Sequence, residues 1–296
     1  MARVLAIGEC MVELRPAGRA TAALAYAGDT FNTAVYLARL GHSVDYATAL
    51  GAGDPFSRGI LGLMSAEGVG RALVAEAPGR LPGLYAIERD AQGERRFHYW
   101  RGEAPARDYM ALADLDALTA ALRAADLVYL SGVTLAVIGE AGRAALLPML
   151  AGARVAFDPN YRAGLWPDPA AARAAMDAVV PHCRFISLGA PDVAEVYGPE
   201  PAEAVARAWA ARGAEVVERA DDRTVRLHID GAVETLAPDR PVRALDTTGA
   251  GDAFNAGYLA ARLDGLAPNL AVAKARALSR AVVRRTGAII PRSAMP

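Results

Sequence analysis

The sequence predicts an α/β fold built on a mostly parallel sheet. Short apolar runs alternate with longer Ala-, Leu- and Arg-rich runs of helical periodicity through most of the 296 residues. Such alternation is typical of βα units, in which each helix returns the chain to a parallel strand. A hydrophobic share of 53% suits one domain with a large core. Ligands in such sheets bind beyond the carboxyl ends of the strands, so we expect the functional residues there.

The expected elements follow one another along the chain. Mostly apolar runs of strand length predict buried strands at Val4–Gly8, Ser43–Ala49, Ala72–Ala75, Leu127–Ser131, Val155–Asp158, Phe185–Leu188 and Val216–Glu218. Runs with apolar residues three and four apart predict helices at Thr30–Leu40, Pro55–Glu67, Leu112–Ala124, Gly139–Leu150, Pro169–Val180, Ala202–Arg212, Asp252–Leu263 and Leu270–Arg285. Gly287 follows the last run and is expected to stop that helix.

Two stretches break the alternation and predict a small β appendage. Glu9–Ala27 has the pattern of short, half-polar strands, and Leu84–Arg101 alternates like a hairpin around a turn at Asp90–Gly93. Because neither stretch has a covering helix, we expect a small sheet formed by about residues 9–29 and 82–107 within a single domain over residues 1–296. Ordinary antiparallel edge strands would show the same pattern.

Composition excludes several functional classes. A net charge of −1 gives no reason to expect a nucleic acid or a membrane surface as partner. Since the chain has no apolar run of about 20 residues, we expect neither a membrane span nor a signal peptide. Cys10 and Cys183 fit no metal spacing, and a cytoplasmic setting is expected. Lys274 is the only lysine, and no Gly-x-x-x-x-Gly-Lys-Ser/Thr is present, which excludes P-loop and protein kinases. Any phosphate must therefore be held by backbone amides, arginine and a metal.

The most informative segment is Asp246–Tyr258. Gly249, Ala250 and Gly251 form a small-residue turn at the start of a helix, where backbone N–H groups bind anions. Asp252 in the same turn can accept a proton from a hydroxyl. An anion hole beside a base is what phosphoryl transfer to an alcohol requires. Because a lone Gly-x-Gly-Asp is more often a capped turn, the interpretation depends on the longer run.

That longer run, Asp-Thr-x-Gly-Ala-Gly-Asp followed by Phe-Asn-Ala-Gly, resembles the C-terminal signature of the ribokinase-like (PfkB) sugar kinases. The resemblance implies a ribokinase-like fold with a β lid over the sugar site. It implies ATP and Mg²⁺ as cofactors, with a monovalent cation as a further candidate. It assigns the general base to Asp252 and the anion hole to the amides of Gly249–Gly251. An exposed lid sheet has unpaired edges and an apolar face, so we expect a homo-oligomer formed through the lid.

Ala27–Gly41 resembles the N-terminal signature of the same family. The resemblance places Gly28, Asp29 and Asn32 against the sugar, although Asp29 could also be no more than a helix cap. The family usually has Gly-Gly where this chain has Ala27-Gly28.

Three further segments, Gly8–Leu14, Tyr99–Ala106 and Asp158–Trp166, together resemble 2-keto-3-deoxygluconate kinases. This resemblance implies a sugar acid as substrate, whose carboxylate an arginine matches bidentately. Its implied substrate residues are Arg101 and Arg162 for the acid end and Tyr85 and Tyr99 for the pocket wall. The alternative is that the arginines are surface charges and the tyrosines pack the strands.

The nucleotide side departs from the family pattern. The family's Asn-x-x-Glu magnesium motif corresponds here to Asp192-Val-Ala-Glu195, which makes Asp192 and Glu195 the candidate metal residues; a solvated helix start is equally consistent. The family's Lys-x-Gly-x-x-Gly is replaced by Glu218–Arg223, without the lysine or either glycine. The candidate nucleotide-binding residues are Glu218, Arg219, Arg223, Arg276, Gly249 and Gly251.

The function predicted from the sequence is ATP-dependent phosphorylation of the 6-hydroxyl of 2-keto-3-deoxygluconate. Within the class, fructokinase and ribokinase are the alternatives. Outside it, a non-catalytic sugar-binding protein on this fold is favoured by the altered Glu218–Arg223 segment and disfavoured by the intact Asp252 turn.

Overall fold

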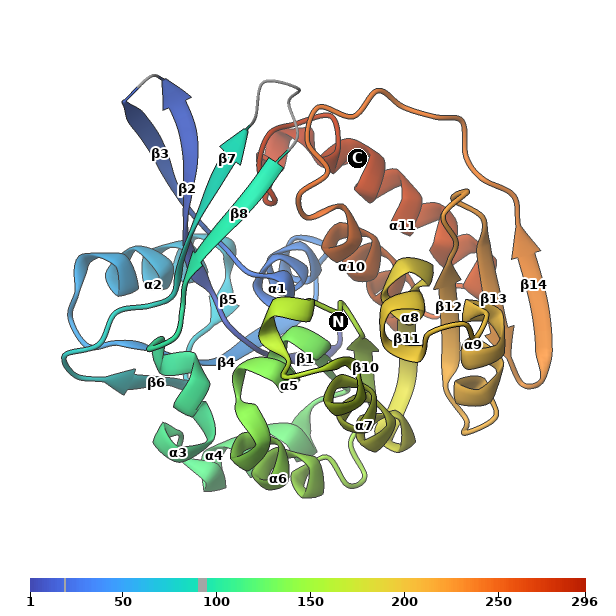
Figure 1. The fold of residues 1–296 in the computed structure, drawn as a ribbon, viewed down its shortest axis with the longest axis horizontal. Helices are drawn as coiled ribbons and strands as arrows, with labels where there is room; N and C mark the ends of the chain where they lie inside the picture. Colours follow the sequence, from blue (N-terminus) through green and yellow to red (C-terminus); the bar gives the residue numbers. More distant parts are fainter. Residues whose placement is uncertain (19, 90–94) are drawn as a thin grey trace.

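The main sheet of the computed structural model is almost wholly parallel. The structure describes residues 1–18, 20–89 and 95–296, and within them ten strands pair in the order β14-β13-β12-β11-β10-β9-β1-β4-β5, with β6 also pairing β4 (Figure 1). Only the β12–β13 and β13–β14 pairs among these are antiparallel. The strands are β1 (Arg3–Ile7), β4 (Ser43–Gly51), β5 (Val69–Gly70), β6 (Val74–Ala77), β9 (Leu127–Ser131), β10 (Val155–Asp158), β11 (Cys183–Gly189), β12 (Glu215–Arg219), β13 (Val225–Ile229) and β14 (Ala232–Leu236).

Helices cover both faces of this sheet. Successive side chains of a strand point to opposite faces, so Leu5 and Ile7 of β1 enter one core cluster while Val4 and Ala6 enter another. The cluster around Val4 packs against α1 (Asp29–Arg39), α2 (Pro55–Glu67), α10 (Ala250–Leu263) and α11 (Pro268–Val282). The cluster around Leu5 packs against α3 (Tyr109–Leu112), α4 (Leu115–Ala124), α5 (Gly132–Val137), α6 (Gly139–Met149), α7 (Pro169–Val179), α8 (Ala190–Tyr197) and α9 (Ala202–Ala210). This arrangement confirms the predicted α/β fold with a mostly parallel sheet.

A second sheet of four strands projects from the body of the molecule (Figure 1). Its order is β3-β2-β7-β8, with β2 and β7 parallel and the outer pairs antiparallel. Its strands are β2 (Met11–Gly18), β3 (Thr21–Ala27), β7 (Leu84–Arg89) and β8 (Arg95–Trp100). Both stretches that broke the alternation are therefore strands of this small sheet, which we call the lid. The predicted turn at Asp90–Gly93 lies outside the described residues.

Several element bounds differ from expectation. The predicted helix Leu112–Ala124 is interrupted because Asp114 caps α4, accepting from the N–H groups of Asp116 and Ala117. The last helix ends at Val282 rather than Arg285. The Val283 carbonyl accepts a hydrogen bond from the backbone N–H of Leu245, which belongs to the segment before α10. The predicted strand Ala72–Ala75 lies two residues later, as β6. Strands β5, β13 and β14 and helices α3, α5 and α8 were not predicted. No helix in the described part of the chain is long and apolar enough to span a membrane.

Candidate active site

A cleft of about 850 Å³ lies where the lid faces the main sheet and the first turns of α1 and α10. Met11, Tyr85, Phe97 and Tyr99 line it from the lid. Most predicted site residues meet there, namely Gly28, Asp29, Asn32, Tyr85, Tyr99, Arg101, Arg162, Asp192, Arg219, Gly249, Gly251 and Asp252. The predictions came from segments far apart in sequence, and the fold brings them to one cavity.

The glycine turn before α10 has a backbone that few other residues could adopt. Gly249 is the N-cap of α10 with φ 74°, and a Cβ there would lie 2.7 Å from the carbonyl oxygen of Ala288. Asp246 braces the turn, since it accepts from the backbone N–H and hydroxyl of Thr248 at 2.9 and 2.7 Å. Ala250 donates its N–H within the turn, to the Thr247 carbonyl at 3.2 Å. Of the predicted anion hole, Gly249 and Gly251 line the cleft, whereas Ala250 does not.

Asp252 lies in the first turn of α10, half-buried at the cleft. Its Oδ2 accepts from Asn32 Nδ2 of α1 at 2.7 Å. Burial, reinforced by the charges of Asp29 and Asp158, raises the pKa of Asp252 to about 8, although the Asn32 hydrogen bond acts in the opposite direction. A carboxylate whose pKa is near the working pH is well suited to accept a proton from an alcohol.

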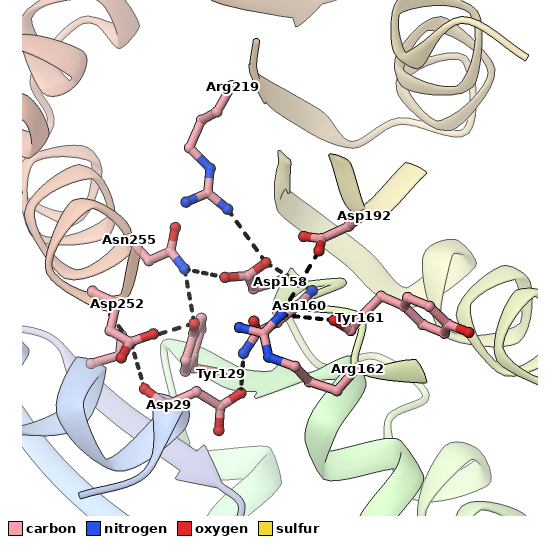
Figure 2. Close-up of polar contacts among 11 residues, drawn as sticks. Asp29, Tyr129, Asp158, Asn160, Tyr161, Arg162, Asp192, Arg219, Asp252 and Asn255 are labelled. Atoms are coloured by element: carbon pink, nitrogen blue, oxygen red, sulfur yellow. Dashed lines mark hydrogen bonds and ion pairs between the residues drawn. The ribbon is translucent and has the colours of Figure 1, made fainter. Parts of the chain in front are cut away.

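Three aspartates converge here, and a neutral amide holds each of them. Besides the Asn32–Asp252 bond, Asn160 Nδ2 donates to Asp29 Oδ2 at 2.8 Å, and Asn255 Nδ2 donates to Asp158 Oδ2 at 2.6 Å (Figure 2). An amide orients a carboxylate without cancelling its charge, so the repulsion among the three remains.

Asp158, Asn160 and Asn255 were missed as site residues by the sequence reasoning. A signal existed for the first two, because Asp158 ends β10 and Asn160 follows two residues later, at the carboxyl edge of the sheet where ligands bind. Asn160 also has φ 35°, a left-handed conformation that non-glycine residues seldom adopt.

The two arginines predicted for a substrate carboxylate differ in their surroundings. The Arg101 guanidinium is paired with the buried Glu9 carboxylate and packs 5.7 Å from the Tyr99 ring centroid. The Arg162 side chain is 55% exposed; it donates to the Tyr161 carbonyl at 2.7 Å and lies 4.0 Å from Asp192. Of the two arginines, Arg162 therefore has the weaker ion pair within the protein and the more accessible guanidinium.

The two predicted metal residues, Asp192 and Glu195, do not face the same cavity. Asp192 lines the cleft, whereas Glu195, one turn later on α8, is exposed and does not line it. Among the described residues, no group of three or more His, Cys, Asp or Glu is arranged to hold a metal ion. Magnesium in kinases usually keeps several waters and uses one or two carboxylates together with substrate phosphates. Asp158 and Asp192 fit that role: burial raises the pKa of both, that of Asp192 to about 6, so each would gain from a nearby cation.

A second cleft, of about 330 Å³, adjoins the first and shares Arg219 and Ala220 with it. Arg223 and Arg276 line this cleft together with Phe254 and Val283. Five of the six predicted nucleotide residues thus line one cleft or both: Arg219, Arg223, Arg276, Gly249 and Gly251.

Glu218 lies apart from both clefts. Its buried carboxylate accepts from Arg226 Nη1 at 2.7 Å and contacts His228 Nε2 at 2.9 Å. The reason is strand alternation, since Glu218 and Arg219 are neighbours on β12 and their side chains point to opposite faces. The geometry therefore does not place Glu218 in a nucleotide site.

The known proteins that this chain resembles are carbohydrate kinases. Residues 1–295 match the pfkB family of carbohydrate kinases. The chain is 38% identical to the 2-dehydro-3-deoxygluconokinase of Escherichia coli K12 over 307 residues, covering 99% of each chain. A crystal structure of the Thermotoga maritima 2-dehydro-3-deoxygluconokinase has a TM-score of 0.85 at 22% identity, with 98% of this chain and 94% of that one covered.

A putative ribokinase II from E. coli, solved in complex with ATP and Mg²⁺, has a TM-score of 0.83 at 19% identity and covers 98% of this chain and 95% of its own. Both solved neighbours share the ribokinase-like fold, which confirms the fold that the sequence motifs implied. The family match over residues 1–295 and the 38% identity to a full-length kinase also show the family, which similarity of fold alone would not. This protein is a phosphotransferase that belongs to the pfkB family of carbohydrate kinases.

Proposed function

We propose that this kinase transfers the γ-phosphoryl group of ATP to the 6-hydroxyl of 2-dehydro-3-deoxygluconate. The observation that carries the proposal is the position of Asp252 beside the Gly249–Gly251 turn in a cleft that also contains Arg101 and Arg162. The relative from E. coli is named for this substrate, and an arginine pair is suited to the carboxylate that distinguishes a sugar acid from a neutral hexose.

In the proposed mechanism Asp252 accepts the proton of the attacking hydroxyl, and the hydroxyl oxygen forms its bond to the γ-phosphorus as the bond to ADP breaks. The N-terminus of α10, with Gly249 and Gly251 lining the cleft, stabilises the negative charge that develops on the transferred group. Asn32 holds the Asp252 carboxylate, and Gly28 lines the sugar side. A Cβ on Gly28 would clash with the Glu9 carbonyl oxygen, so a larger residue there would displace this wall.

For the nucleotide we propose the second cleft, with Arg219 at the passage between the two. The purine and ribose would occupy the space between Phe254 and Val283, and the phosphates would extend past Arg219 toward Gly251. The solved relative that holds ATP and Mg²⁺ supports this donor and metal. When bound, Mg²⁺ supplies charge neutralisation of the donor phosphates, and Asp158 and Asp192 are the residues that would hold its water shell.

The proposal predicts substrate discrimination that depends on Arg162. In a coupled assay of ADP release from Mg·ATP, we expect turnover with 2-dehydro-3-deoxygluconate and little with fructose or ribose. In Arg162→Ala the KM for the sugar acid should rise about 10- to 100-fold, the scale of a lost charge-assisted hydrogen bond of about 1.5–3 kcal/mol. The matched control is Arg173→Ala, a half-exposed arginine on α7 outside both clefts, which should leave KM unchanged.

Turnover of fructose or ribose in place of the sugar acid would support the kinase activity but refute 2-dehydro-3-deoxygluconate as its substrate. Binding of sugar without turnover of any of the three would favour a non-catalytic sugar-binding protein.

We also propose that a second copy of the chain covers the outer face of the lid. Strand register places Leu14, Leu24, Leu84 and Trp100 on the face opposite to Tyr85 and Tyr99, and Leu24 and Trp100 are 48% and 61% exposed. We expect sedimentation to show a homo-oligomer for the wild type and a smaller particle for Trp100→Glu, because a buried unpaired charge opposes association. A monomeric wild type at micromolar concentration would contradict the proposal.

A further inference from the structure

A small cavity lies between the main sheet and α10. Tyr129 of β9, Ser187 of β11 and Asn255 of α10 line it, and most of the remaining lining is apolar. Asn255 stands one helical turn after Asp252, so the cavity is next to the catalytic turn. It offers about 10 Å³ to a water-sized sphere, close to the roughly 10–15 Å³ that one water molecule requires.

Two buried polar atoms of the cavity lining have hydrogen-bonding capacity that the protein does not use. Asn255 Oδ1 and Ser187 Oγ have no hydrogen-bond partner among the residues that the structure describes. The orientation of the Asn255 amide is fixed, because its Nδ2 donates to Asp158 Oδ2 at 2.6 Å and to the Tyr129 hydroxyl at 3.1 Å (Figure 2). A reversed amide would place its oxygen against the Asp158 carboxylate, so the oxygen must find a donor elsewhere.

We propose that one water molecule occupies this cavity, donating to Asn255 Oδ1 and accepting from the Ser187 hydroxyl. The water fixes the amide in the orientation that holds Asp158. Ser187 is then a positioning residue, which acts through the water and Asn255 on a carboxylate at the cleft. The water site is inferred from the cavity and its two polar atoms. The positioning role of Ser187 rests on the proposed function, in which Asp158 faces Mg²⁺.

The water site is tested by a high-resolution crystal structure of the full chain without ligands. We expect an ordered water within about 3 Å of both Asn255 Oδ1 and Ser187 Oγ. In Ser187→Val the added methyl groups fill the cavity, and the water should be absent. A wild-type cavity without density, in a map that shows other buried waters, would overturn the site.

The positioning role is tested by the magnesium dependence of ADP release. In Ser187→Val the Mg²⁺ concentration for half-maximal activity should rise about tenfold, the lower end for loss of an outer-shell partner, while KM for the sugar stays unchanged. Leu188→Ile is the matched control, because Leu188 follows Ser187 on β11, packs into the core on the other face and does not line the cavity. An unchanged magnesium dependence in Ser187→Val, with the water lost, would overturn the role. A wild type without any kinase activity would count against the proposed function alone, since the diffraction experiment does not depend on activity.

Discussion

Asp252→Asn is expected to fold normally and to lose at least about 100-fold in kcat, the usual contribution of a positioned general base. The amide keeps the size of the side chain and its place beside Asn32, but it cannot accept the substrate proton. KM for the sugar should change much less than kcat. Asp264→Asn is the matched control, because Asp264 follows the same helix and its side chain is 55% exposed.

The pH dependence of kcat/KM should also identify Asp252 as the base. Since the base works in its deprotonated form and the pKa of Asp252 is raised to about 8, activity should climb with pH up to about 8 and then level off. A rate that does not vary between pH 6 and 9, or an Asp252→Asn variant with near wild-type kcat, would refute Asp252 as the base.

Arg219→Ala is expected to lower kcat by at least about 100-fold, the scale for removing one group that stabilises transition-state charge. Its Nη2 lies 3.5 Å from Asp158 Oδ1, and its Nη1 lies 3.0 Å from where a Cβ on Gly251 would stand. The guanidinium also packs 5.7 Å from the Phe254 ring centroid, which fixes it between the two clefts. It is therefore the cation best placed to contact the group in transfer.

Steady-state kinetics of Arg219→Ala and Arg219→Lys with varied Mg·ATP would test this role. The lysine variant should recover part of the rate, because an ammonium keeps the charge but not the planar fork. Arg284→Ala, an exposed arginine outside both clefts, should behave as the wild type. If Arg219→Ala matched the wild type in both kcat and KM for Mg·ATP, the charge at this position would have no part in transfer.

The fold and much of the site could be predicted because they depend on local pattern. The alternation of short apolar runs with helical periodicity predicted the parallel sheet, and the Gly249–Asp252 turn predicted a candidate anion site whose glycines line the cleft. The β13–β14 hairpin carried a signal that was overlooked. Asp230 and Gly231, both with positive φ, form the Asp-Gly turn between alternating strands, a combination typical of a tight hairpin.

Other features could not be predicted because they depend on long-range contacts. The pairing of Arg101 with Glu9 joins residues 92 positions apart, and that of Asn255 with Asp158 joins residues 97 apart. Glu218 was misplaced for a different reason: a motif aligned by position does not say which face of the strand each residue occupies.

The three amide-held aspartates also have a consequence for protein engineering. Because the folded-state pKa of Asp252 is raised, the folded protein binds more protons than the unfolded chain between about pH 4 and 8, and the free energy of unfolding contributed by this group falls as pH rises through that range. The ligand-free enzyme thus keeps a concentration of negative charge that weakens its own fold. A selection for thermal stability at alkaline pH, made without regard to turnover, would favour neutral residues at Asp29, Asp158 and Asp252, and would return robust proteins that no longer phosphorylate sugar.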